Sequence, residues 1–172
     1  MYILGDIGNS ETKLFLVNSK NRIIKYKNFP SKEINNRVLN NNFNSLTNDY
    51  SKIEKVLFCS VVPKSFSLIK KFLHKKIKKK CYEVKDLKLR SLMNIDVNYK
   101  EVGSDRLTNA IGLLNYKDNF IILDFGTATT FDVITKKSYK GGVIAPGIKI
   151  SLNTLSDNAN LIPKINLKKI KN

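Results

Sequence analysis

The stretch YILGDIGNSETKLFLV (Tyr2 to Val17) begins as an apolar strand, breaks at a carboxylate and a glycine, and then resumes apolar residues. Asp and Gly are common in turns, so this pattern predicts a hairpin of two strands. A second stretch, IILDFGTATTFDVI (residues 121 to 134), repeats the design, and its Asp124 stands where Asp6 stands in the first. A repeated strand, turn and strand indicates a chain built from two related lobes.

Hydrophobic periodicity and turn residues place the other elements around these hairpins. We expect strands at Tyr2 to Ile7, Thr12 to Val17, Arg22 to Phe29, Lys55 to Val62, Cys81 to Val84, Phe120 to Asp124, Thr130 to Thr135 and Tyr139 to Ile144. We expect helices after Pro30, from Pro63 through Lys70 to Lys80, from Ser104 as N-cap, and from about Ile148 to Leu155. The order predicts an α/β fold with a first lobe over residues 1–100 and a partial second lobe over residues 101–172.

Composition narrows the classes of function. The chain has 42% hydrophobic and 26% charged residues and lacks an apolar run of the roughly 18 residues that a membrane span needs, so we expect a cytoplasmic protein with no membrane partner. A formal net charge of +17 raises nucleic acid as a partner. In Lys70 to Lys80, however, Phe72, Leu73 and Ile77 recur at helical spacing, which is typical of an amphipathic helix with a solvated lysine face. Nucleic acid binding is therefore the less favoured interpretation.

The residues of both turns suit a phosphate chain. Glycine lets the backbone approach a ligand closely, and successive turn amides form a concave set of donors for phosphate oxygens. A carboxylate beside phosphates needs a cation between them, so Asp6 and Asp124 favour a metal ion. One Asp-x-Gly alone would be read as a plain hairpin turn, but two copies favour a cleft that holds a polyphosphate from both sides. Hydroxyl, amide and ammonium groups surround the turns: Asn9, Ser10, Thr12 and Lys13 in the first, and Thr127, Thr129 and Thr130 in the second.

A third motif, GSDR (Gly103 to Arg106), offers groups for phosphoryl transfer. With Ser104 as N-cap, Asp105 and Arg106 fall in the first turn of a helix, where the helix dipole favours a carboxylate. Asp105 could then receive the proton of a hydroxyl acceptor, and Arg106 could bind a carboxylate of that acceptor by two parallel hydrogen bonds. An ordinary helix start with a surface Asp and Arg is the alternative interpretation.

Four motifs together resemble, in order and spacing, those of the type III pantothenate kinases: DIGNSETK (residues 6–13), GSDR (103–106), DFGTATTFD (124–132) and GGVIAPG (141–147). That family belongs to the superfamily of acetate kinase, sugar kinases, Hsp70 and actin, so the resemblance implies two duplicated ribonuclease H-like lobes, an actin-like ATPase and kinase fold. It also implies an enzyme that phosphorylates pantothenate to 4'-phosphopantothenate with ATP, the first step of coenzyme A biosynthesis. The implied assembly is a homodimer with the acceptor site at its interface.

The resemblance assigns roles by position. The implied ATP-binding residues are Asp6, Ile7, Gly8, Asn9, Ser10, Glu11, Thr12, Lys13 and Thr127, with Asp6 acting on Mg²⁺ through water. The implied pantothenate-binding residues are Tyr99, Gly103, Ser104, Asp105 and Arg106, with Asp105 as catalytic proton acceptor and Arg106 on the carboxylate. Asp124 is implied to hold a monovalent cation, K⁺ or NH₄⁺.

Two departures from the family pattern leave alternatives open. A threonine that contacts pantothenate in the family has no clear counterpart near Asn158 and Ala159, and the chain stops where relatives continue. We therefore expect a C-terminally shortened chain with an incomplete second lobe. The alternative hypotheses are a catalytically weak or inactive homologue that binds nucleotide, a kinase for another hydroxy acid, and a basic nucleic-acid-binding protein.

Overall fold

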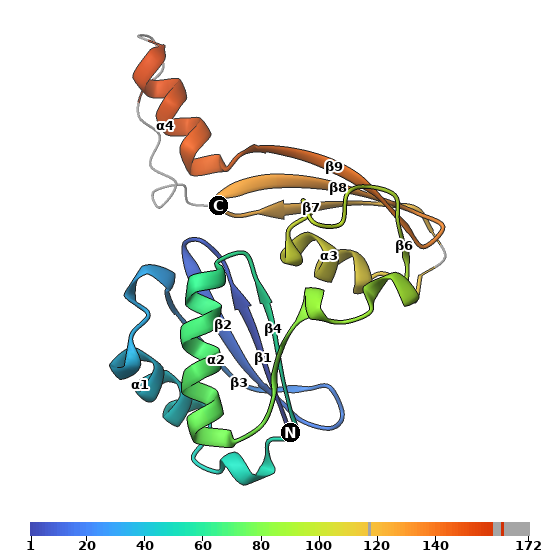
Figure 1. Cartoon of the computed structure of the whole chain (residues 1–172). Helices are drawn as coiled ribbons and strands as arrows, with labels where there is room; N and C mark the ends of the chain where they lie inside the picture. The colour runs from blue at the N-terminus through green and yellow to red at the C-terminus, as the bar shows by residue number, and fades with distance from the viewer. Residues whose placement is uncertain (117, 160–162, 164–172) are drawn as a thin grey trace.

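The chain folds into two mixed β-sheets (Figure 1). The computed structural model describes residues 1–116, 118–159 and 163. The strand order is β3-β2-β1-β4-β5 in the first sheet and β6-β9-β8-β7 in the second. The predicted α/β class is confirmed, and the antiparallel meander that opens the chain recurs in the second sheet.

The first sheet begins with the meander β1 (Tyr2–Ile7), β2 (Glu11–Val17) and β3 (Ile23–Pro30). Strands β4 (Lys55–Ser60) and β5 (Cys81–Glu83) continue the sheet from β1 in parallel. Helices α1 (Asn36–Leu46) and α2 (Pro63–Ile77) pack against it, and short 3-10 turns lie at Ser31–Glu33, Tyr50–Lys52, Val84–Asp86 and Leu89–Ser91. Every predicted strand of this lobe is present to within about two residues, a shift typical of element ends.

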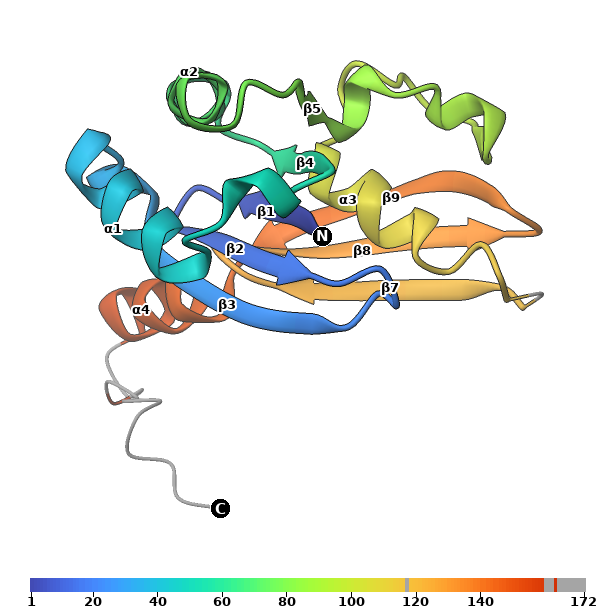
Figure 2. The ribbon, with the colours of Figure 1, turned by 90° about the horizontal axis from the view of Figure 1, so that it is seen from below.

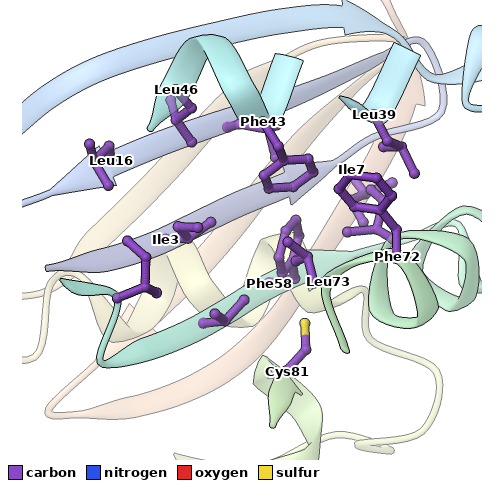
Figure 3. Close-up of a cluster of buried hydrophobic side chains, with 14 of the residues drawn as sticks. Ile3, Ile7, Leu16, Leu39, Phe43, Leu46, Phe58, Phe72, Leu73 and Cys81 are labelled. Carbon is purple, nitrogen blue, oxygen red and sulfur yellow. The ribbon is translucent and has the colours of Figure 1, made fainter. Parts of the chain in front are cut away.

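Apolar side chains from both helices and from all five strands form the core of the first lobe (Figure 3). Phe58 of β4 is fully buried among Ile3 and Ile7 of β1, Phe43 of α1 and Leu73 of α2. Because α2 buries its apolar stripe here, its lysines lie on the opposite, solvated face, as the spacing predicted. Burial also raises the pKa of the Cys59 and Cys81 thiols to about 12, as expected of packing residues.

The second sheet contains the short β6 (Asn94–Ile95) and the meander β7 (Phe120–Phe125), β8 (Ala128–Thr135) and β9 (Ser138–Pro146). Helix α3 (Ser104–Ile111) lies between the two sheets, in contact with β4 and β8, and α4 (Ile148–Asn158) follows β9 (Figures 1 and 2). On the face of this sheet that points away from α3, several large apolar side chains are exposed: Ile121, Leu123, Phe125 and Val143. Among the described residues, the second lobe thus has the meander and α4 but no counterpart of α1 and α2.

The N-cap of helix α3 lies one residue earlier than the sequence predicted. Ser104 was predicted as the N-cap of α3, but Gly103 is the N-cap and Ser104 is the first helical residue. Its hydroxyl instead donates a hydrogen bond to Glu83, at the end of β5. The lobe boundary at residue 100 stays a prediction, and β6, which precedes it, pairs with β9.

Within residues 1–116, 118–159 and 163, no helix is both long enough and apolar enough to cross a bilayer.

Candidate active site

The two Asp-x-Gly turns face each other across one cleft of about 490 Å³. Asp105, from the first turn of α3, lies on the wall between them, and the start of α4 closes one side. The cleft is lined by Asp6, Gly8, Asn9, Ser10, Glu11 and Lys13 of the first hairpin, by Asp124, Phe125, Gly126, Thr127, Ala128 and Thr130 of the second, and by Val61, Asp105, Gly147, Lys149 and Ile150. The structure therefore brings together most of the residues predicted to bind ATP, the predicted proton acceptor and the predicted cation ligands.

In each turn the glycine amide donates a backbone hydrogen bond, to the third residue after it in the first turn and to the second residue after it in the second turn. The Gly8 amide donates to the Glu11 carbonyl at 2.9 Å, and the Gly126 amide donates to the Ala128 carbonyl at 2.9 Å. Gly147 supports the second turn from below: its amide donates to the Thr127 carbonyl at 3.1 Å, and a Cβ at this position would lie 2.4 Å from that oxygen. Only glycine permits such a close approach of two backbones.

A side-chain contact joins the two turns directly. The hydroxyl oxygens of Ser10 and Thr127 lie 2.7 Å apart and share a hydrogen bond. Both residues line the cleft and are exposed, so the same hydroxyls are available to a ligand between the turns. Ser10 and Thr127 thus place two hydroxyls at the point where the two turns meet.

Two of the predicted ATP-binding residues do not reach the cleft. Ile7 is fully buried in the first core. Thr12 is also fully buried, and its hydroxyl shares a hydrogen bond of 2.9 Å with Ser31. The Ser31 hydroxyl in turn donates to the Gly8 carbonyl at 2.6 Å. The side chain of Thr12 therefore supports the first turn from behind.

The electrostatics of the cleft favour a bound cation. The pKa of Asp6 is raised, mainly by burial and further by the negative charges of Asp105 and Asp124, while Lys13 opposes the shift. The Lys13 ammonium forms a long ion pair with Asp6, at 3.8 Å. A partly buried carboxylate beside two further negative charges attracts positive charge.

The residues around Asp124 fit a cation with oxygen ligands. Asp124 accepts a hydrogen bond of 3.1 Å from the Asn109 side chain and pairs across the sheet with Thr130. The Thr130 hydroxyl is buried and has no hydrogen-bond partner among the described residues. Within those residues no three His, Cys, Asp or Glu side chains are close enough to bind one metal ion together, so ligands other than protein carboxylates have to complete any metal site.

Of the residues predicted to bind pantothenate, the phosphoryl acceptor, only Asp105 lines the cleft. The Tyr99 hydroxyl donates to the Lys85 carbonyl at 2.9 Å, and Ser104 is bonded to Glu83. Gly103 lies against the Asp105 carboxylate, where a Cβ would be 2.3 Å from its oxygen. Their roles toward pantothenate stay predictions.

Sequence reasoning missed the partner of Arg106. Its Nε donates a hydrogen bond of 2.7 Å to Asp132, which is completely buried in β8. The Tyr139 hydroxyl donates to the same carboxylate oxygen at 2.5 Å. The available signal was a charged residue at a strand position that shares its face with the apolar Ile134.

Comparisons with known proteins agree with this geometry. The family model for type III pantothenate kinases matches residues 2–172. The type III pantothenate kinase of Pelagibacter ubique (strain HTCC1062) is 60% identical over 169 residues, which are 98% of this chain and 68% of that protein.

Two solved structures share the fold. A Campylobacter jejuni protein described as a Baf family transcriptional activator matches with a TM-score of 0.53 and 23% identity, over 99% of this chain and 68% of its own. A Sinorhizobium meliloti protein described as a 2-dehydro-3-deoxygalactonokinase matches with a TM-score of 0.52 and 8% identity, over 92% of this chain and 58% of its own. These likenesses show the fold alone, while the family match and the Pelagibacter relative show more: the chain belongs to the type III pantothenate kinase family.

Proposed function

We propose that this chain transfers the γ-phosphate of ATP to the primary hydroxyl of pantothenate and forms 4'-phosphopantothenate, the first step of coenzyme A biosynthesis. The observation that carries the proposal is the single cleft in which both Asp-x-Gly turns meet Asp105. Phosphoryl transfer requires little covalent chemistry from the protein, because positioning and charge stabilisation supply most of the catalysis. A cleft with donors on two walls and a carboxylate between them meets those needs.

In this proposal the two turns bind the phosphate chain from opposite sides. The backbone amides near Gly8 and Gly126 and the hydroxyls of Ser10 and Thr127 donate hydrogen bonds to phosphate oxygens. Lys13 adds positive charge from the first wall. The turns thereby orient the terminal phosphate toward Asp105.

Two cations complete the proposed site. Mg²⁺, which would be held by Asp6 through water, neutralises phosphate charge when it is bound. K⁺ or NH₄⁺ would be held by Asp124, with the unpartnered Thr130 hydroxyl as a further oxygen ligand. The raised pKa of Asp6, caused by burial and by the negative charges of Asp105 and Asp124, supports a cation beside that carboxylate.

Asp105 would accept the proton that the primary hydroxyl loses as its oxygen bonds to phosphorus. The carboxylate lines the cleft in the first turn of α3. Arg106, the next residue, would bind the carboxylate of pantothenate. The homodimer, its interfacial acceptor site and the cytoplasmic location stay predictions.

A coupled assay of ADP release tests the proposal. Pantothenate is compared with a panel of other hydroxy acids, each with Mg²⁺ and with K⁺ present or absent. We expect turnover with pantothenate that requires both cations. ATP binding without ADP release in a folded sample would instead favour the inactive homologue, and a preference for a different acid would contradict the substrate assignment.

A further inference from the structure

A buried ion pair lies behind the acceptor motif. The Asp132 side chain has no exposed surface, and that of Arg106 is 12% exposed. One carboxylate oxygen of Asp132 accepts from Arg106 Nε at 2.7 Å and from the Tyr139 hydroxyl at 2.5 Å, and it lies 2.6 Å from Arg106 Nη2. The Nε and Nη2 side of the guanidinium is therefore occupied by Asp132, and an acceptor carboxylate has to approach from the Nη1 side.

The surrounding backbone leaves room for the guanidinium and for little else. A Cβ at Gly142 of β9 would lie 2.8 Å from Arg106 Nη2 and 1.9 Å from the Phe131 carbonyl oxygen. Arg106 is thus held on three sides: by its own helix α3, by Asp132 of β8 and by the bare backbone of β9. These contacts enclose the Nε and Nη2 side of its guanidinium.

Stability alone is a poor reason for such a pair. Removing two charges from water costs free energy that their attraction only partly returns, and apolar residues of similar volume often serve the core equally well. A buried carboxylate does, however, fix the orientation of a guanidinium whose third nitrogen, Nη1, is not used by the pair. The arrangement is the one expected where an arginine has to meet a ligand in a defined direction.

We propose that Asp132 is a positioning residue for the phosphoryl acceptor. By holding Arg106, it sets the direction from which the carboxylate of pantothenate is bound, and so the distance of the reacting hydroxyl from Asp105, the neighbouring residue on α3. Tyr139 holds Asp132 in turn. The inference rests on the proposed function, in which Arg106 binds that carboxylate.

The test is steady-state kinetics of the full chain and of Asp132→Asn, with KM measured separately for pantothenate and for ATP. A misplacement of about 1 Å can cost about 10²-fold in rate, so kcat/KM for pantothenate is expected to fall about a hundredfold. KM for ATP is expected to stay unchanged, because the nucleotide is bound by the two turns. The alcohol analogue of pantothenate offers Arg106 no carboxylate, and kcat/KM for this acceptor is expected not to fall in the variant.

Tyr139→Phe is the second variant, since it keeps both charges of the pair and removes only one hydrogen bond to Asp132. It is expected to change kcat/KM for pantothenate in the same direction by a smaller factor, and it carries the test if Asp132→Asn does not fold. Equal losses toward pantothenate and its alcohol analogue, or a parallel rise of KM for ATP, would overturn the positioning role in either variant. A wild-type chain that phosphorylates neither acceptor would overturn the proposed function together with this inference, whereas an active wild type with unaffected variants would overturn this inference alone.

Discussion

Gly5 lies in the centre of β1, one residue before Asp6, and its backbone touches the ring of Phe58 on β4. A Cβ at this position would lie 2.1, 2.3 and 2.9 Å from three ring carbons, whereas carbon atoms in ordinary contact are about 3.5–4.0 Å apart. Phe58 is fully buried, so its ring has to move by more than about 1 Å into a packed core, or β1 has to move away from β4. Overpacking of this kind costs about 1–3 kcal/mol, and the severity of the overlap places Gly5→Ala near the upper value.

Thermal unfolding followed by circular dichroism measures this cost. About 3 kcal/mol corresponds to a melting temperature roughly 6–12 °C lower in a chain of this size. Gly126→Ala is the matched control, because its Cβ would meet only the Ala128 carbonyl oxygen at 3.7 Å, and its effect is expected to stay within about 0.5 kcal/mol. Adding Phe58→Leu to Gly5→Ala should return part of the loss, with a coupling of about 0.5–3 kcal/mol. An unchanged melting temperature in Gly5→Ala would refute the packing that places Asp6 at the edge of the cleft.

Three further predictions concern the cleft. Asp105→Asn is expected to lower kcat for ADP release by a factor of about 10² to 10⁴. Asp96→Asn is the control, because Asp96 forms an exposed ion pair with Lys140, and it is expected to leave ADP release unchanged. Wild-type turnover in Asp105→Asn would remove Asp105 from the mechanism. The pKa of Asp6 is raised above its ordinary 3.8, so the native state binds this proton more tightly than the unfolded state does. The contribution of Asp6 to the free energy of unfolding is therefore fully present below pH 3.8 and is lost as the pH rises through the raised pKa. At neutral pH, Mg²⁺ should raise the melting temperature of the wild type but not of Asp6→Asn, and an equal response of both proteins would argue against a cation at Asp6. Ser10→Ala removes the hydroxyl that forms a hydrogen bond with Thr127. The loss of one hydrogen bond worth about 0.5–1.5 kcal/mol should raise KM for ATP roughly 2- to 12-fold. An unaltered KM for ATP would place these two hydroxyls outside the nucleotide site.

Local patterns were sufficient for most of the elements. The alternation in β1 and β2 and the Asp-x-Gly between them predict a hairpin whose strands pair, because strand faces and turn chemistry are properties of neighbouring residues. The helix that begins at Pro63 was equally accessible, since Ile69, Phe72 and Leu73 recur at helical spacing and are all buried. The repeat of the first turn at Asp124 also predicted two walls of one site, and the structure places both turns on one cleft.

Contacts between distant segments were not accessible in the same way. Serine is a favoured N-cap residue, so the sequence predicted Ser104 at that position. Its hydroxyl instead donates a hydrogen bond to Glu83, 21 residues earlier in the chain, and does not cap the helix. The sequence predicted that the Thr12 hydroxyl binds a ligand. In the structure this hydroxyl is buried and forms a hydrogen bond with Ser31, so it does not face the cleft. The role of Asp132 depends on both α3 and β9, so its position on the same strand face as Ile134 gave only a hint of a buried partner.

The most direct test of the central claim, that both turns bind one phosphate chain, is a titration of the ¹⁵N-labelled protein with Mg²⁺ and a non-hydrolysable ATP analogue, followed by nuclear magnetic resonance. We predict that the amide signals of Gly8 and Ser10 and those of Gly126 and Thr127 shift together and saturate at the same nucleotide concentration. Shifts confined to one turn, or to the lysine-rich face of α2, would contradict the account.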